Sequence, residues 1–193
     1  MIVNISETNR AFIWTPEKTA SNLASMIFNH FDFSAYDVKT KEKVSNGFKH
    51  FHSNFFFEGH EHYDFIMTCR NPYDRFLSIN GYGTLPYEKL KSNLEIFFTT
   101  KVSHSQMNKN LMIRKPDFII RVENMLEDYL KIPFVRESEF YKSGQLEQMV
   151  ELKVNSSQIE KSKSIMDSQL ADLIYYNNII FFDLCGYEKN SWK

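Results

Sequence analysis

The feature that most constrains the fold is residues 63–78, where an apolar run ends in an arginine followed by Asn-Pro. Residues 63–69 are mainly apolar and predict a buried strand. Arg70 would then lie at the carboxyl end of a strand, where open α/β sheets bind ligands. Pro72 suits the first position of a helix, because its fixed φ is helical and its missing N–H is not needed there. Ser78 would lie two turns into that helix, so Arg70 and Ser78 can converge on one anion.

The rest of the chain alternates predicted strands with predicted helices. Further strands are predicted over 11–15, 55–60 and 118–122, and helices over 23–31, from 72, over 86–100, 123–131 and 167–185. Residues 34–54 are polar and lysine-rich, and we expect a short helix and loops there. Asp167 is the expected N-cap of the last helix, and Gly186 is expected just after its end. This alternation predicts one α/β domain over 1–193, with a mainly parallel central sheet flanked by helices.

Composition excludes several classes of function. The chain has 193 residues and a net charge of −1, without the basic excess of a general nucleic-acid binder. The longest apolar stretch, 173–185, contains two asparagines and an aspartate, so it does not predict a membrane span. The first ten residues do not show the pattern of a signal peptide. Cys69 and Cys185 are too few for a disulfide framework. We therefore expect a cytoplasmic protein with no nucleic-acid or membrane partner.

The loop after the first predicted strand is a candidate anion site. A strand–loop–helix layout aims backbone N–H groups and a helix dipole at a phosphate. Lys18 adds a positive charge, Thr19, Ser21 and Asn22 add donors, and the small Ala20 permits close approach. The nucleotide-kinase pattern G-x-x-x-x-G-K-[ST] is absent, since no glycine precedes Gly47. The alternative is a surface loop that caps a helix.

The two loops together resemble the sulfotransferases that use 3′-phosphoadenosine 5′-phosphosulfate (PAPS). The similarity is to the glycan branch of the family, and particularly to the uronyl 2-O-sulfotransferases. Residues 15–21, T-P-E-K-T-A-S, resemble the 5′-phosphosulfate loop, and residues 70–78, R-N-P-Y-D-R-F-L-S, resemble the 3′-phosphate motif. Residues 118–128 and 183–187 are similar to later elements of the family. The resemblance implies a P-loop-like nucleotide-binding fold, PAPS as co-substrate, adenosine 3′,5′-bisphosphate (PAP) as product, and no metal.

The resemblance also implies roles for individual residues. Arg70 and Ser78 would hold the 3′-phosphate, and the backbone from Thr19 through Ala20 and Ser21 to Asn22 would hold the phosphosulfate. Lys18 would stabilise charge on the oxygen that links sulfur to phosphorus. Glu17 is a departure, because the family has Pro followed directly by Lys: either the loop has one extra residue, or Glu17 occupies the lysine position. The alternative for Arg70 is a structural ion pair with Asp74 or Glu123, while Ser78 merely packs.

Four histidines form two H-x-H pairs, at 50 and 52 and at 60 and 62. Residues i and i+2 share a face of a strand, so each pair could chelate zinc. The resemblance instead implies that His60 is the general base, because residues 57–60 resemble the Gly-His element of the 2-O-sulfotransferases. Neutral imidazole near pH 7 suits that task. His62 and Glu17 are the alternative bases, and a solvent-facing loop is the remaining interpretation of the histidines.

The function that we expect is therefore transfer of a sulfuryl group from PAPS to a hydroxyl, or less readily an amine, of an acceptor. A carbohydrate or other small molecule is the expected acceptor class. Two alternatives stay open from the sequence. One is a non-catalytic protein that binds PAP or PAPS, and the other is a zinc-stabilised interaction module.

Overall fold

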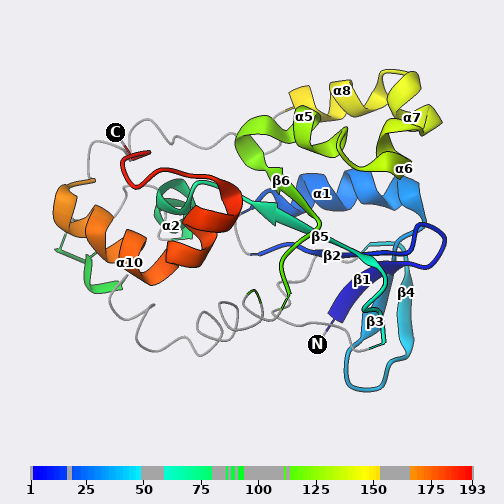
Figure 1. The fold of residues 1–193 in the computed structure, drawn as a ribbon, viewed down its shortest axis with the longest axis horizontal. Coiled ribbons are helices and arrows are strands. Elements are labelled where there is room, and N and C mark those ends of the chain that lie inside the picture. Colours follow the sequence, from blue (N-terminus) through cyan, green and yellow to red (C-terminus); the bar gives the residue numbers. More distant parts are fainter. Residues whose placement is uncertain are drawn as a thin grey trace.

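The computed structural model describes residues 2–16, 19–48, 59–79, 86, 88–89, 91–93, 111, 114–152 and 166–192. In this part of the chain a six-stranded sheet is flanked by helices, which makes the fold α/β (Figure 1). The strands are β1 (Ile2–Ser6), β2 (Ala11–Trp14), β3 (Ser34–Asp37), β4 (Lys43–Asn46), β5 (Asp64–Cys69) and β6 (Phe118–Arg121). Their order across the sheet is β4-β3-β1-β2-β5-β6.

The sheet is mixed and not mainly parallel as expected from the sequence. Among the described strands, β2/β5 and β5/β6 pair in parallel, whereas β1/β2, β1/β3 and β3/β4 pair antiparallel. β1 and β2 are joined by only a short turn, and a parallel pair needs a much longer crossover. The prediction of a parallel sheet thus holds for the half formed by β2, β5 and β6.

The prediction of a helix and loops over 34–54 is wrong for its described part, 34–48, which contains the hairpin β3–β4. The Asp37 carboxylate accepts hydrogen bonds from the backbone N–H groups of Lys39 and Thr40, at 2.8 and 3.1 Å. Lys41 takes a positive φ of 60° in the same turn. An aspartate that bonds to the backbone two residues later is a turn signal, and it reverses the chain here.

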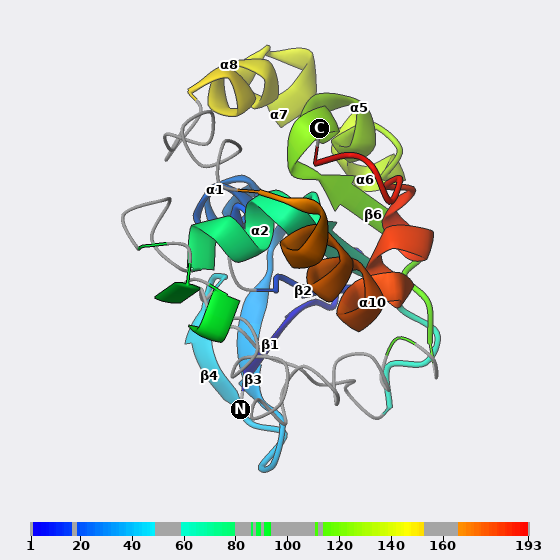
Figure 2. The ribbon, with the colours of Figure 1, turned by 90° about the vertical axis from the view of Figure 1, so that its left-hand side faces the viewer.

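Helices cover both faces of the sheet. They are α1 (Ser21–Phe28), η1 (Asn29–Phe31), α2 (Pro72–Ile79), η2 (Val122–Asn124), α5 (Met125–Tyr129), α6 (Pro133–Arg136), α7 (Glu139–Lys142), α8 (Gln145–Glu151) and α10 (Ser168–Cys185). α1 and α5–α8 lie on one face, and α10 lies on the other and packs along α2 (Figures 1 and 2). β2 is consequently buried on both sides, as is usual for strands in the parallel part of an α/β sheet.

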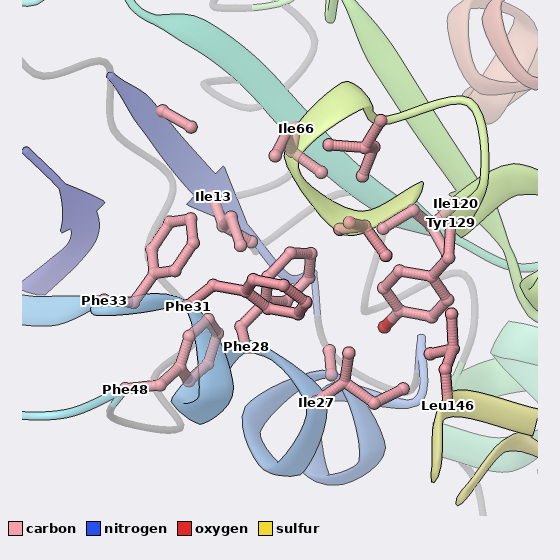
Figure 3. Packing of buried hydrophobic residues seen from close by; sticks show 14 of the residues in the cluster. Ile13, Ile27, Phe28, Phe31, Phe33, Phe48, Ile66, Ile120, Tyr129 and Leu146 are labelled. Carbon is pink, nitrogen blue, oxygen red and sulfur yellow. The ribbon is translucent and has the colours of Figure 1, made fainter. Parts of the chain in front are cut away.

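The core beneath α1 is rich in aromatic rings (Figure 3). Phe28 meets Phe33 edge-on with ring centroids 5.2 Å apart, stacks on Phe48 at 6.2 Å, and lies 5.5 Å from Tyr129. Ile13 of β2 belongs to the same cluster. These contacts hold α1 against the sheet, and they therefore also position the loop that leads from β2 into α1.

The long helix α10 has the ends that the sequence predicts. Asp167 accepts a hydrogen bond from the backbone N–H of Leu170 at 2.8 Å, and Gly186 adopts a left-handed φ of 72° after the last turn. Inside the helix, Asn178 departs from helical geometry with φ −131° and ψ 18°. No helix in the described ranges is both long and apolar enough to traverse a lipid bilayer.

Candidate functional site: the carboxyl edge of the parallel strands

The carboxyl ends of β2, β5 and β6 meet at one edge of the sheet. Trp14 at the end of β2 is aligned with Met67, and Cys69 at the end of β5 is aligned with Arg121. The chain leaves β2 through Thr15 and leaves β5 through Arg70, so both predicted anion loops start from neighbouring strands at the same edge. Open α/β sheets bind their ligands at such an edge.

Thr19 links the loop between β2 and α1 to β5 through hydrogen bonds. Its hydroxyl donates to the backbone carbonyl of Pro16 at 2.6 Å and shares a hydrogen bond with the Thr68 hydroxyl at 2.7 Å. Because the single proton of Thr19 goes to Pro16, Thr68 is the donor of the second bond. Thr19 and Thr68 are 1% and 0% exposed, so both bonds are inside the protein. Thr19 therefore has a structural role in the loop. Glu17 and Lys18 lie outside the described residues.

Ala20 sets the geometry of the loop just before α1. It adopts φ 56° and ψ 34°, a left-handed conformation that costs a non-glycine residue about 1–2 kcal/mol. Ala20 is also the N-cap residue of α1, and its methyl group cannot accept a hydrogen bond from the first turn of the helix. Backbone N–H groups at left-handed turns form anion-binding concavities, and the amino end of a helix carries partial positive charge. Strained backbone of this kind is often found at functional sites.

Arg70 follows β5 and is partly buried. Within the described part of the chain its guanidinium makes no hydrogen bond or ion pair. The neighbouring strand offers a contrast, because Arg121 binds the Asp128 carboxylate through Nε at 2.8 Å and Nη2 at 2.7 Å. Glu123, one suggested structural partner of Arg70, instead accepts the Asn71 N–H at 3.0 Å. The Arg70 guanidinium thus lies at the carboxyl end of β5, and no carboxylate among the described residues binds it.

The helix after Arg70 begins as the sequence predicts. Asn71 is its N-cap, with its side-chain oxygen accepting the Tyr73 N–H at 3.0 Å, and Pro72 is the first helical residue. Ser78 lies on α2 and is only 4% exposed. The structure thus places Arg70 and Ser78 on one strand–helix unit. Arg75, by contrast, packs between rings, with Phe76 and Phe181 at 5.4 and 5.5 Å from its guanidinium carbon.

His60 lies at the other edge of the sheet. Its Nε2 atom is 3.6 Å from Glu7 Oε1, and its ring meets Tyr63 edge-on at 4.6 Å. Tyr63 also donates a hydrogen bond to Glu7, which is in the turn before β2. This cluster is therefore at the amino ends of β2 and β5. The six residues of β5, about 20 Å of extended chain, separate it from Arg70. The structure does not bring His60, or nearby His62, into the candidate site.

Arg114 organises that amino edge, a role that the sequence did not reveal. Its guanidinium donates to the backbone carbonyls of Glu61 and Tyr63, at 3.0 and 2.5 Å, and to the Asp117 carboxylate at 3.0 Å. The Gly59 N–H holds the pKa of Glu61 below its usual value, and burial raises the pKa of Asp64. In the part of the chain that the structure describes, no three or more His, Cys, Asp or Glu residues come together in a group that could hold a metal ion. His50 and His52 lie outside the described residues.

Residues near the end of α10 also reach this edge of the sheet, and the sequence did not predict a role for them. The Tyr187 hydroxyl donates to Glu123 at 2.5 Å, and the Asn71 side chain donates to the Ser191 hydroxyl at 3.0 Å. The resemblance of residues 183–187 to the family pointed to this place without giving it a role. The segment following α10 therefore meets the turn between β5 and α2.

Comparison with known proteins gives no indication of the function. No protein-family model matches it, and neither a curated protein nor a solved structure matches it. The geometry favours an anionic ligand, because the left-handed Ala20 at the start of α1 and the Arg70 guanidinium follow the neighbouring strands β2 and β5. A ligand with two separate anionic groups could place one at the start of α1 and the other at Arg70.

Proposed function

We propose that the protein is a sulfotransferase that transfers a sulfuryl group from PAPS to a hydroxyl of an acceptor, with a carbohydrate as the expected class. The observation that carries the proposal is the Arg70 guanidinium at the β5 edge, which has no anionic partner among the described residues. It lies beside the loop that Thr19 and Thr68 tie to the same strand. PAPS carries anionic groups at its 5′ and 3′ positions, one for each loop. The resemblance of residues 15–21 and 70–78 to the family supports a P-loop-like nucleotide site.

Each loop then has its own part of the nucleotide. The backbone N–H groups from Thr19 to Asn22 and the amino end of α1 hold the 5′-phosphosulfate. The planar Arg70 fork binds the 3′-phosphate through paired hydrogen bonds, and Ser78 adds a hydroxyl. Lys18 stabilises negative charge on the bridging oxygen.

The reaction needs no covalent intermediate on the protein. The acceptor oxygen attacks sulfur, the bond between sulfur and the bridging oxygen breaks, and PAP leaves with that oxygen. Positioning and charge stabilisation provide most of the catalysis in such transfers. His60 has no catalytic part in this proposal because of its place at the opposite edge. Glu17, in the first loop, takes the acceptor proton instead.

A non-catalytic PAP-binding protein is the second candidate. Glu17 interrupts the Pro-Lys order of the family, and the described residues around Arg70 offer no histidine as a base. Such a protein would bind PAP through the same residues but would not transfer sulfate. Measuring transfer of labelled sulfate from PAPS to a panel of sugars and phenols, alongside calorimetric titration of PAP, separates the two candidates.

Substitution of Arg70 tests the proposal most directly. Arg70→Ala should weaken PAP binding by about 10–100-fold, the effect of losing charged hydrogen bonds. Binding of adenosine 5′-phosphosulfate, which lacks the 3′-phosphate, should change little. Arg136→Ala, at an exposed arginine of α6, is the control for loss of charge. Equal losses for both ligands in Arg70→Ala would contradict the proposal, since they would show a structural role for Arg70.

A further inference from the structure

One carboxylate joins three segments that are far apart in the sequence. Glu123, in η2 after β6, accepts the backbone N–H of Asn71 at 3.0 Å through Oε1. Through Oε2 it accepts the hydroxyl of Tyr187, just after α10, at 2.5 Å. The turn after β5, the turn after β6 and the end of α10 are thus held together at the edge where Arg70 lies.

The chemistry of this carboxylate favours strong bonds. Burial raises the pKa of the Tyr187 hydroxyl, and the nearby Cys69 and Glu123 raise it further, so the hydroxyl remains a donor at neutral and alkaline pH. A hydrogen bond to an ionised carboxylate is shorter and stronger than one between neutral groups. The bond between Tyr187 and Glu123 is therefore a firm support for the Asn71 backbone.

The segment after α10 adds a second set of bonds to the same turn. The Asn71 side chain donates to the backbone carbonyl of Ser191 at 3.3 Å and to its hydroxyl at 3.0 Å. The Tyr73 hydroxyl donates to the carbonyl of Lys189 at 2.5 Å. Figure 1 shows this red segment passing over α2. The start of α2 is thus bonded to Lys189 and Ser191.

We propose that Glu123 and Tyr187 are positioning residues that hold the β5–α2 turn so that Arg70 can select a ligand bearing a 3′-phosphate. Arg70 is bonded to Asn71 in the chain, so a fixed Asn71 backbone restricts where the guanidinium can lie. The guanidinium itself makes no bond to the described residues, so its donors are available to a ligand. This inference rests on the proposed function, because it assigns that 3′-phosphate to Arg70.

The first experiment compares PAP with adenosine 5′-monophosphate, which differs only by lacking the 3′-phosphate. Tyr187→Phe should weaken PAP binding by about 3–10-fold, the effect of one hydrogen bond, and should leave the monophosphate unchanged. Glu123→Ala should weaken PAP binding more. Glu123→Gln should recover most of the affinity, because its amide oxygen can still accept the Asn71 N–H. Tyr141→Phe, which removes a hydroxyl from α7, away from residues 187–191, is the matched control and should change neither affinity.

The second experiment follows hydrogen exchange of the Asn71 amide without any ligand. The amide should be protected in the wild-type protein and in Glu123→Gln, and it should exchange faster in Glu123→Ala. Rapid exchange of the Asn71 amide in the wild type would overturn the inference. So would a Tyr187→Phe variant that loses affinity equally for both nucleotides, or one that loses no affinity for PAP. If the wild type binds neither nucleotide, the proposed function fails, whereas a protected Asn71 amide still shows that Glu123 holds the turn. Tyr187→Phe and Glu123→Gln conserve volume, so the test does not depend on folding of Glu123→Ala.

Discussion

At the scale of single residues, Tyr129 brings a hydroxyl group into the aromatic core. Its ring lies beside Phe28, and its oxygen points toward the α1 side chains (Figure 3). The residue is 0% exposed, and the hydroxyl has no hydrogen-bond partner among the described residues. Burial accordingly raises the pKa of this phenol far above its usual value. A buried hydroxyl without a partner costs folding free energy.

Tyr129→Phe should therefore leave the free energy of unfolding unchanged or raise it by about 1 kcal/mol. Tyr73→Phe is the matched variant, since the Tyr73 hydroxyl donates to Lys189, and it should lower that free energy by about 1 kcal/mol. Urea unfolding of the three proteins measures both effects. A larger loss in Tyr129→Phe than in Tyr73→Phe would show that the Tyr129 hydroxyl has a partner after all.

Ala20 offers a second test at the residue scale. Glycine occupies the left-handed region without steric cost, whereas a β-branched side chain is strongly disfavoured there. Ala20→Gly should change the unfolding free energy by less than about 1 kcal/mol, and Ala20→Val should lower it by about 1–3 kcal/mol. Thermal unfolding measures the difference between the two variants. A Val variant as stable as the wild type would contradict a left-handed Ala20.

At the scale of elements, β6 and α5 are joined through one buried carboxylate. Asp128 is 1% exposed and receives hydrogen bonds from Arg121 and from Lys131, the latter at 2.7 Å. Burial by itself raises the pKa of Asp128, but the bonds from Arg121 and Lys131 outweigh it and lower the pKa below its usual value. A lowered folded-state pKa contributes stability that is present above the unfolded-state value of about 4 and is lost as the pH falls through the folded-state value.

Asp128→Asn should consequently lower the unfolding free energy at pH 7 by about 2–4 kcal/mol, because it leaves the Arg121 guanidinium without its anion. The difference from the wild type should shrink as the pH falls below about 4, because the unfolded chain takes up a proton at this carboxyl first, and it should be lost once the pH has passed the lowered folded-state pKa. Urea unfolding between pH 7 and pH 3 measures this. Asp172→Asn, at an exposed ion pair with Lys189, should have little effect. A pH-independent difference for Asp128→Asn would contradict the charge assignment.

At the scale of the whole molecule, the sheet separates two polar clusters. Arg70 lies at the carboxyl edge of the parallel strands, and His60 lies with Glu7 and Tyr63 at the amino edge. His60 is part of the turn before β5, and its backbone carbonyl accepts a hydrogen bond from Arg114. It is too far from the Arg70 edge for proton transfer to a shared substrate.

We therefore expect His60→Ala to retain PAP affinity and sulfate transfer, with only a modest loss of stability. Glu17→Ala should retain PAP affinity and lose transfer by about 10²–10⁴-fold, the usual contribution of a general base. Steady-state rates and calorimetric titration of both variants provide the measurements. A large loss of rate in a folded His60→Ala variant would contradict this view and would return the base role to His60.

The sequence alone was sufficient for elements whose ends are marked by local chemistry. The strand ending at Cys69, the helix starting at Pro72, and the Asp167 and Gly186 ends of α10 were all predicted and are confirmed. Each depends on residues within a few positions of one another: a proline at the first helical position, a capping carboxylate, a left-handed glycine. Such signals act without the rest of the fold.

Only the tertiary structure decided where these elements meet. The strand order β2-β5-β6 places the loops that follow these three strands side by side, although they are far apart in the chain. The fold brings Glu123 to the Asn71 turn, 52 residues away in sequence, and brings Tyr187 to Glu123, 64 residues away. Sheet order follows from the burial of many apolar side chains at once, and no short stretch of sequence carries that information.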